Sequence, residues 1–325
     1  MNQRTSTLIV AHRRVDTAQQ VAKAVVDAGI TDVWAWVDGP RTSVEAEQTT
    51  AVVTLLESQE WPGEFHLLKN DLNHGVARAV PAALDWVFAH RDEAVVLEDD
   101  CVPTVEFFDF VDLMIERYRN NPRVALISGT RIGEPLPTIS TVPYQFSTFP
   151  LIWGWATWRN RWAHYEHDIR GWRRQVPLAS LVKQGGVLHA WDWYRLFNSV
   201  ATKDPWSWDY QLTYMLWSHS QVTVVPSVDL VQNVGFGEMA THTGGRPQWA
   251  PQIPSEKIRK RVVLLSQKEE FIAEPDLRLD REIRRSVFSP PIRSRFLRRA
   301  ALGYRRVVSV LPPLSSKKGS GQKLQ

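Results

Sequence analysis

Three consecutive carboxylates, Glu98-Asp99-Asp100, directly follow the apolar run Ala94-Val95-Val96-Leu97. Like charges at one point repel each other, which raises the pKa of one or more of them unless a positive group neutralises them. Mg²⁺ and Mn²⁺ can do this, because both prefer carboxylate oxygens and complete their shells with water and substrate phosphates. The acidic triplet (Glu98, Asp99 and Asp100) therefore predicts a metal site. The alternative is a solvated acidic turn that leads into a helix at Pro103-Thr104.

The segments around the triplet alternate between strands and helices, as in an α/β protein. Short apolar runs indicate buried strands, and Gly29 is placed to end the first helix. Strand, helix and strand in succession form right-handed parallel units, and such sheets bind ligands beyond the carboxyl ends of their strands. The triplet stands at such an end. The predicted strands are 8–11, 32–37, 65–68 and 94–97, and the predicted helices are 17–28, 45–58 and 78–90.

The triplet, with Pro103 and Phe107-Phe108 after it, resembles the metal-binding motif of GT-A glycosyltransferases. The Glu-Asp-Asp form is that of N-acetylglucosaminyltransferase-I-like enzymes and their bacterial relatives. The resemblance implies a Rossmann-like, mostly parallel central sheet flanked by helices, with a catalytic domain over 1–275 whose donor half ends near residue 130 and whose acceptor half covers about 131–275. Further matches follow in the same order over about residues 8 to 245: Ala11 to Arg14, Asp38, Asn73-His74-Gly75 with Arg78, Ser128-Gly129, Phe149-Pro150 with Gly154-Trp155, Trp208-Asp209, and Asn233 to His242.

The resemblance also implies roles for single residues in binding a nucleotide-diphosphate sugar, with uracil or guanine as the base. Two departures from the family pattern bear on these roles. Ala11-His12-Arg13-Arg14 differs from the usual Asn-Arg-Pro or Asp-Arg pattern, and Trp208-Asp209-Tyr210 has one acid where relatives often have two. The implied roles are metal binding for Asp100 and His242; contact with ribose and donor sugar for Glu98 and Asp99; base binding for Asp38; contact with base or diphosphate for Ala11, Arg14 and Arg78, and with diphosphate for His242; and catalysis for Asp209.

These roles agree with the chemistry of sugar transfer. Breaking a sugar–phosphate bond leaves a nucleoside diphosphate whose growing negative charge a bound cation stabilises. The attacking hydroxyl loses its proton on the opposite face of the sugar, and a carboxylate such as Asp209 suits that task. The alternative for Asp209 is an N-cap of a helix that starts at Tyr210. The alternative for His242 is an ordinary polar residue of a Gly/Thr-rich loop.

Tryptophan is unusually frequent in the stretch that runs from the triplet to just beyond the predicted base, Asp209. The sequence has fifteen tryptophans, and ten of them lie between Trp153 and Trp217. Aromatic faces suit the apolar faces of sugar rings. We therefore expect an acceptor groove that includes Trp206 and Trp208, with Glu238 as a further acid for acceptor or donor hydroxyls. The alternative is that most of these rings fill the core.

Charge is distributed unevenly along the 325 residues. The segment from Arg284 to Gln325 has eleven Lys or Arg and no acid, so the residues before it carry 28 basic and 35 acidic side chains. Apolar residues from Ile292 to Leu311 follow helical spacing between arginines, which predicts a basic amphipathic helix that ends at Pro312-Pro313. Docking on an anionic membrane and packing on the body remain the two interpretations of this extension, 276–325, whose last residues we expect to be disordered. A nucleic-acid partner is not expected.

Composition indicates a folded cytoplasmic protein, and membrane docking of its basic end would hold it on the inner face of the plasma membrane. Hydrophobic residues make up 43% and charged residues 23%, and the single Cys101 excludes an intramolecular disulfide. The uncharged stretches 135–158 and 210–228 contain prolines or polar residues that exclude them as membrane spans.

The preferred interpretation is a Mn²⁺- or Mg²⁺-dependent, inverting glycosyltransferase that acts on a glycan or a lipid-linked saccharide. One alternative is a sugar-1-phosphate nucleotidyltransferase, although Leu8 to Arg14 lacks the glycine-rich phosphate loop with which such enzymes usually begin. The other alternative is a relative that binds nucleotide sugar or glycan without turnover.

Overall fold

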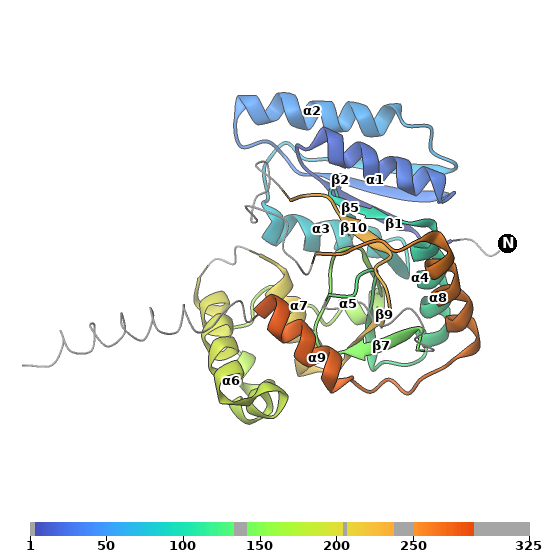
Figure 1. Cartoon of the computed structure of the whole chain (residues 1–325). Helices are drawn as coiled ribbons and strands as arrows, with labels where there is room; N and C mark the ends of the chain where they lie inside the picture. The colour runs from blue at the N-terminus through green and yellow to red at the C-terminus, as the bar shows by residue number, and fades with distance from the viewer. Residues whose placement is uncertain (1–3, 133–141, 204–206, 237–249, 289–325) are drawn as a thin grey trace, which may run out of the picture.

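The computed structural model describes residues 4–132, 142–203, 207–236 and 250–288, and an eight-stranded sheet lies at the centre of this part of the chain (Figure 1). Six strands run in one direction, and β7 and β8 run against them. The expected α/β class with a mostly parallel sheet is confirmed. In spatial order the strands are β3 (Glu64–Lys69), β2 (Asp32–Val37), β1 (Thr7–Ala11), β4 (Glu93–Glu98), β8 (Trp155–Trp158), β6 (Val124–Ser128), β9 (Val222–Pro226) and β7 (Tyr144–Ser147).

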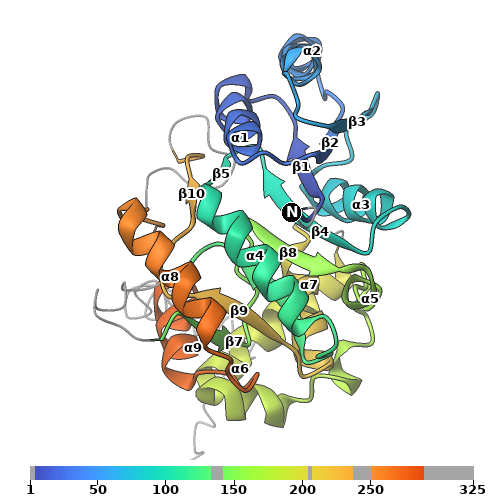
Figure 2. The ribbon, with the colours of Figure 1, turned by 90° about the vertical axis from the view of Figure 1, so that its right-hand side faces the viewer.

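Helices cover both faces of the sheet (Figure 2). Helices α1, α4 and α8 pack on one face, and α3, α5, α6, α7 and α9 contribute to the core on the other, while α2 packs beside α1. The described helices are α1 (Val15–Asp27), α2 (Ser43–Ser58), α3 (Val76–Phe88), α4 (Val105–Tyr118), α5 (Arg159–Trp162), α6 (Leu178–Thr202), α7 (Asp209–Ser218), α8 (Glu256–Lys268) and α9 (Leu277–Ile283), with the short turns η1 (Trp172–Arg174) and η2 (Arg284–Phe288).

The first four strands and three helices follow the sequence pattern to within two residues at most boundaries. Every residue of β1 and β2 is buried, which explains why both are nearly continuous apolar runs. Helix α1 is terminated by Gly29, which follows the C-cap Ala28 and has a φ of +68° that glycine adopts without strain. The carboxyl ends of β1, β2 and β4 meet at the same edge of the sheet.

A small second sheet connects the end of the acidic triplet to a distant part of the chain. Strand β5 (Cys101–Pro103) pairs antiparallel with β10 (Val231–Asn233), so that Asn233 lies opposite Cys101. This pairing places the segment after β10 directly beside Asp100.

None of the helices in the described ranges has both the length and the apolar content needed to cross a bilayer. The basic amphipathic helix expected after Ile292 lies outside the described residues, as do the last residues that we expected to be disordered. The described elements of the extension 276–325 are α9 and η2.

Candidate functional site

The acidic triplet lies where predicted, at the carboxyl end of β4, and Arg14 lies against it. Glu98 is the last residue of β4, and Asp99 and Asp100 form the turn into β5. The Arg14 guanidinium forms ion pairs with both aspartates, with 2.8 Å between its Nη1 and Oδ2 of Asp100. The backbone N–H of His12 donates to the other oxygen of Asp99 at 3.2 Å. Asp99 is therefore held by protein groups, as a positioning residue would be.

The remaining carboxylates of the triplet have fewer partners. The Glu98 carboxylate accepts no hydrogen bond from the residues that the structure describes, although it lines the central pocket. Among the described residues, Asp100 receives, besides Arg14, only long contacts of 3.5 Å from the Cys101 thiol and the side-chain amide of Asn233. All three acids line the pocket, and the carboxylates of Glu98 and Asp100 have the fewest partners among the described residues.

Negative charge exceeds positive charge at this corner. Burial raises the pKa of Glu98 to about 8, and the charges of Asp100 and Asp99 add to the effect. Burial also raises the pKa of Asp99 to about 6, although Arg14 opposes the shift. Among the described residues, Arg14 is the guanidinium that pairs with this triplet, and an all-oxygen donor set of this kind fits Mg²⁺ or Mn²⁺.

The segment that follows β10 forms one wall of this corner. The backbone N–H of Val234 donates to the Asp100 carbonyl at 2.9 Å, and that of Gly235 donates to the side-chain oxygen of Asn233 at 2.8 Å. A Cβ atom at position 235 would lie 2.0 Å from Oδ2 of Asp100. Any larger residue at position 235 would force this carboxylate to move.

A tight backbone contact holds β10 in place. The N–H of Gly129 donates to the Gly154 carbonyl at 2.7 Å, and the Gly129 carbonyl accepts from the N–H of Val231 at 3.1 Å. A Cβ atom at either glycine would come within 2.6 Å of the Val231 side chain. Two segments that the resemblance singled out, at Ser128-Gly129 and at Gly154-Trp155, therefore meet at Val231, two residues before the matched segment that starts at Asn233.

Asp38, the predicted base-binding residue, organises the loop on the other side of the pocket. Its carboxylate accepts from the backbone N–H groups of His74 at 2.9 Å and Gly75 at 3.0 Å, and from the Asn73 side-chain amide at 3.0 Å. These bonds fix the start of α3 against the end of β2. Asp38 and Ala11 both line the pocket.

Between these walls lies a pocket of about 490 Å³. The rings of Trp153 and Phe236 meet edge to face at 5.6 Å on its border and provide an aromatic surface. Sequence patterns predicted no role for either ring, nor for His12, whose ring contacts the Gly39 carbonyl at 3.1 Å. Phe236 lies within the matched segment Asn233 to His242, so the resemblance could have indicated that it lies at the site.

The predicted catalytic base, Asp209, is the first residue of α7 and accepts a hydrogen bond from the Ser207 hydroxyl. Its charge contributes to raising the pKa of Glu98, so the two carboxylates interact electrostatically. Burial, followed by Asp209, raises the pKa of Tyr210 to about 12. Helix α7 starts at Asp209 rather than at Tyr210, and its N-cap position is Trp208, so the N-cap alternative for Asp209 is not what the structure shows.

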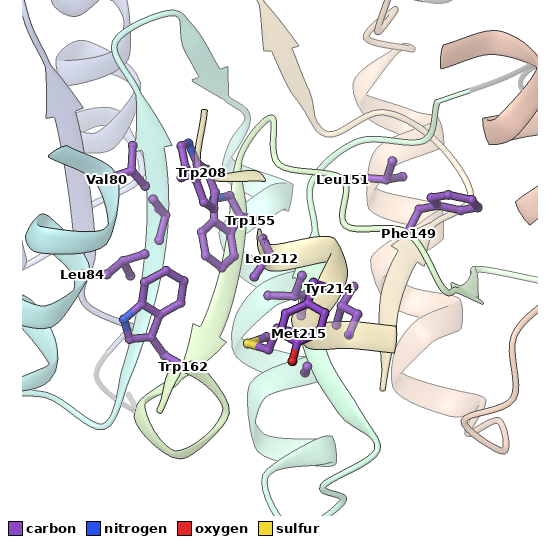
Figure 3. Packing of buried hydrophobic residues seen from close by; sticks show 14 of the residues in the cluster. Val80, Leu84, Phe149, Leu151, Trp155, Trp162, Trp208, Leu212, Tyr214 and Met215 are labelled. Carbon is purple, nitrogen blue, oxygen red and sulfur yellow. The ribbon is translucent and has the colours of Figure 1, made fainter. Parts of the chain in front are cut away.

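Trp208 requires a correction. Its ring is 1% exposed and stacks on Trp155 with 5.5 Å between the ring centres, deep in the core (Figure 3). It cannot offer a face to an acceptor sugar in this arrangement, because core rings cover it. The other acceptor candidates, Trp206 and Glu238, and the metal candidate His242 lie outside the described residues.

Arg78 is on α3 and is exposed, and it is not among the residues that line the pocket. It lies one turn after Gly75, which does line the pocket. The predicted donor-site residues that the structure brings together around the pocket are Ala11, Arg14, Asp38, Glu98, Asp99 and Asp100.

A second group of metal-ligand residues lies at the opposite edge of the sheet. Asp32, Glu64 and His66 have ligand atoms within 4.8 Å of one another. Arg91 already fills this group, because its guanidinium donates to both oxygens of Asp32 at 2.7 and 3.2 Å. This is an ion-pair cluster, and it does not replace the acidic triplet as a candidate metal site.

No family model matches this chain, and no curated protein matches it. Among solved structures, a protein of Bacillus anthracis described as a glucose-1-phosphate thymidylyltransferase, in complex with sucrose, aligns with 14% identity and a TM-score of 0.31 over 50% of this chain and 74% of that one. A 4-diphosphocytidyl-2C-methyl-D-erythritol synthase of Anaerococcus prevotii aligns with 6% identity and a TM-score of 0.35 over 81% of this chain and 99% of that one. Both likenesses are remote, and the function is therefore argued from the residues of this chain.

Proposed function

We propose that this chain is a metal-dependent glycosyltransferase that moves a sugar from a nucleotide-diphosphate sugar to a glycan or lipid-linked acceptor, with inversion. The observation that carries the proposal is the pocket at the carboxyl ends of β1, β2 and β4. It combines three neighbouring acids, the Arg14 guanidinium that pairs with two of them, and an aromatic border. Ligands bind at this edge of α/β sheets.

The triplet suits the diphosphate end of a donor. A divalent cation held by Asp100, with Glu98 beside it, would neutralise the diphosphate as it leaves. Arg14 lies 2.8 Å from Asp100 and would donate to a diphosphate oxygen from the same place. Asp99 keeps Arg14 in position, since it is paired with the guanidinium and is 4% exposed.

The other groups suit the nucleoside and the reaction centre. The ordered loop that Asp38 holds offers backbone groups on the side away from the triplet, where a base would lie. In the transfer step, the acceptor oxygen attacks the anomeric carbon, the bond from that carbon to the diphosphate oxygen breaks with its electron pair, and Asp209 takes the acceptor proton. The electrostatic interaction between Asp209 and Glu98 supports this placement of the base near the triplet.

The test uses a panel of UDP- and GDP-sugars with Mn²⁺, measured by thermal stabilisation and by release of nucleoside diphosphate. Ligand binding raises apparent stability by mass action. Asp100→Ala should lose both metal-dependent binding and release. Asp209→Asn should keep donor binding and lose transfer by roughly 10²- to 10⁴-fold, which is the usual contribution of a general base.

A matched control is Glu64→Gln, which removes a carboxylate at the opposite edge of the sheet and should change neither readout. Metal-independent stabilisation that survives in Asp100→Ala would contradict the proposal. Pyrophosphate release from a nucleoside triphosphate and a sugar phosphate would replace it with nucleotidyl transfer.

A further inference from the structure

Helix α6 has an exposed apolar surface on the side away from the core. Val187 is 73% exposed, and Leu188 and Trp191 are each 55% exposed. His189 and Ala190, which lie between them, and Trp193, which follows, are buried and point inward. Leu178 and Val182 are exposed in the first part of the helix. We call these five residues (Leu178, Val182, Val187, Leu188 and Trp191) the α6 apolar face.

The helix is interrupted in the middle of this face. Gly186 has φ of +83° and ψ of 179°, so two helical parts meet there at a break. Glycine alone adopts this conformation without strain. The break is followed at once by Val187 and Leu188, which places two of the most exposed apolar side chains of the face at its middle.

Basic residues predominate in the sequence that contains the α6 apolar face. From residue 170 to residue 203 the sequence has six Lys or Arg and one acid, whereas the residues before Arg284 as a whole carry more acids than bases. The Arg173 guanidinium lies 5.3 Å from the ring centre of Tyr194, and Trp191 stacks on the same ring at 6.1 Å. A basic side chain and the exposed tryptophan are therefore neighbours on the surface.

The basic extension starts beside the same helix. Nη1 of Arg284 donates to the carbonyl of Gln184 at 2.7 Å, next to the break, and Val287 packs against the core cluster that α6 also contacts. Figure 1 shows α9, which leads into this segment, close to α6. The 37 residues beyond Phe288, with nine Lys or Arg and no acid, thus follow a segment that contacts α6.

From these observations we propose that the α6 apolar face docks on the surface of an anionic lipid bilayer. Exposed apolar side chains with a tryptophan, bordered by Lys and Arg, are the composition that inserts at the level of the headgroups. Each nearby basic residue adds attraction to anionic lipid. This surface is distinct from the pocket, and the inference does not depend on the proposed transfer reaction.

Electrostatic repulsion argues against two other partners for the α6 apolar face, which are the basic extension and a second copy of the chain. The basic extension could fold back on the face, but it would then bring its arginines against Arg173, Arg174 and Lys183. A second copy of the chain could pair face to face, but the same basic residues would oppose each other across the contact. An anionic membrane attracts both the face and the extension, and it covers the apolar side chains.

The test uses the full chain with a polarity-sensitive fluorophore on Leu188→Cys, because the native thiol, Cys101, is fully buried. Vesicles of phosphatidylcholine alone and with phosphatidylglycerol at about a third of the lipid are the probes. We expect a blue shift with the anionic vesicles that is lost as salt is raised, since screening shortens the reach of charge. The matched control is Leu264→Cys on α8, which is 51% exposed and should show no shift.

Variants sharpen the result. Removing one large apolar side chain with Leu188→Ser should weaken binding to anionic vesicles about tenfold. Leu264→Ser should leave it unchanged. Arg174→Glu with Lys183→Glu should weaken binding at low salt, with a smaller effect at high salt.

Three outcomes would overturn the proposal. A label at position 188 that is already blue-shifted without vesicles and unaffected by them would show that the extension covers the face. A shift that follows protein concentration in the absence of lipid would indicate a second copy. Emission that stays water-like with anionic vesicles would show that no bilayer contact forms.

Discussion

The two edges of the central sheet both carry buried acids, but the residues that the structure describes shift the pKa values of these acids in opposite directions at the two edges. At the amino end of β2, burial tends to raise the pKa of Asp32, but hydrogen bonds from Arg91 and the Ser6 hydroxyl outweigh it and the pKa is lowered. At the carboxyl end of β4, the pKa values of Glu98 and Asp99 are raised. Buried carboxylates therefore stabilise the fold at one edge, whereas at the other the described residues hold three acids beside the single guanidinium of Arg14.

The largest expected effect is a loss of donor binding when the acidic triplet is changed but not when the opposite edge is changed. Asp100→Asn removes one negative charge from the acidic triplet, so metal-dependent nucleotide-sugar binding should weaken about 100-fold or more. Calorimetry with Mn²⁺ and the donor measures it. The control is His66→Gln in the ion-pair cluster at the opposite edge, which should bind donor as the wild type does. Equal losses in both variants would break the comparison.

For stability, the larger effect is expected at the opposite edge, in the ion-pair cluster around Asp32. Asp32→Ala leaves Arg91, the Ser6 hydroxyl and the Trp34 ring N–H without their acceptor. Removing one partner of a buried ion pair costs about 3 kcal/mol of unfolding free energy, which urea unfolding measures.

The control for that measurement is Asp27→Ala, which breaks an exposed pair with Lys23 and should cost less than about 1 kcal/mol. The folded fraction of Asp32→Ala should bind donor with unchanged affinity. If Asp32→Ala stayed stable but bound donor weakly, the donor site would lie at the Asp32 edge and the proposed site at the acidic triplet would be contradicted.

Gly235→Ala tests the wall beside the triplet. The new methyl group would meet Oδ2 of Asp100 at 2.0 Å, so the carboxylate must move and donor binding should weaken about tenfold or more. Gly171→Ala is the matched control, because nothing lies within 4 Å of its Cβ position. Unchanged binding in Gly235→Ala would mean that this carboxylate position does not matter.

The smallest expected effect is on pH dependence. In chelator, folded protein holds a proton on Glu98 between pH 4.5 and about 8, whereas unfolded protein has lost it. Because the native state binds more protons over this window, stability falls as the pH rises through it. Glu98→Gln should flatten that fall, with a gain on the order of 1 kcal/mol at about pH 8. A steeper fall in the variant would contradict the charge excess at the triplet.

The first half of the fold was predictable because its signals are local. Apolar runs and turn residues predicted β1, β2 and β4 to within one residue at most ends. The sheet beyond β4 was not predictable in this way. Strand β8 inserts antiparallel between β4 and β6, and nothing local to Trp155–Trp158 specifies which partners it takes.

The site too was predictable where its signals are local in the sequence and unpredictable where they depend on packing. The position of the acidic triplet followed from its place after a buried strand, and the proximity of Arg14 to it was implied only by resemblance. The Trp208 prediction failed because sequence does not distinguish a ring that binds sugar from one that fills a core. Phe149, Trp193 and Trp217 illustrate this second use, since they pack against one another in the same cluster.

The contact of Gly129 and Gly154 with Val231 has a consequence for screens of random variants. Neither glycine lines the pocket, yet a methyl group at either would push β10 away, and the wall beside Asp100 would shift with it. A saturation mutagenesis scan scored by activity would therefore mark both positions as intolerant, although no substrate reaches them. Such a map would overstate the size of the active site unless protein abundance were read in parallel.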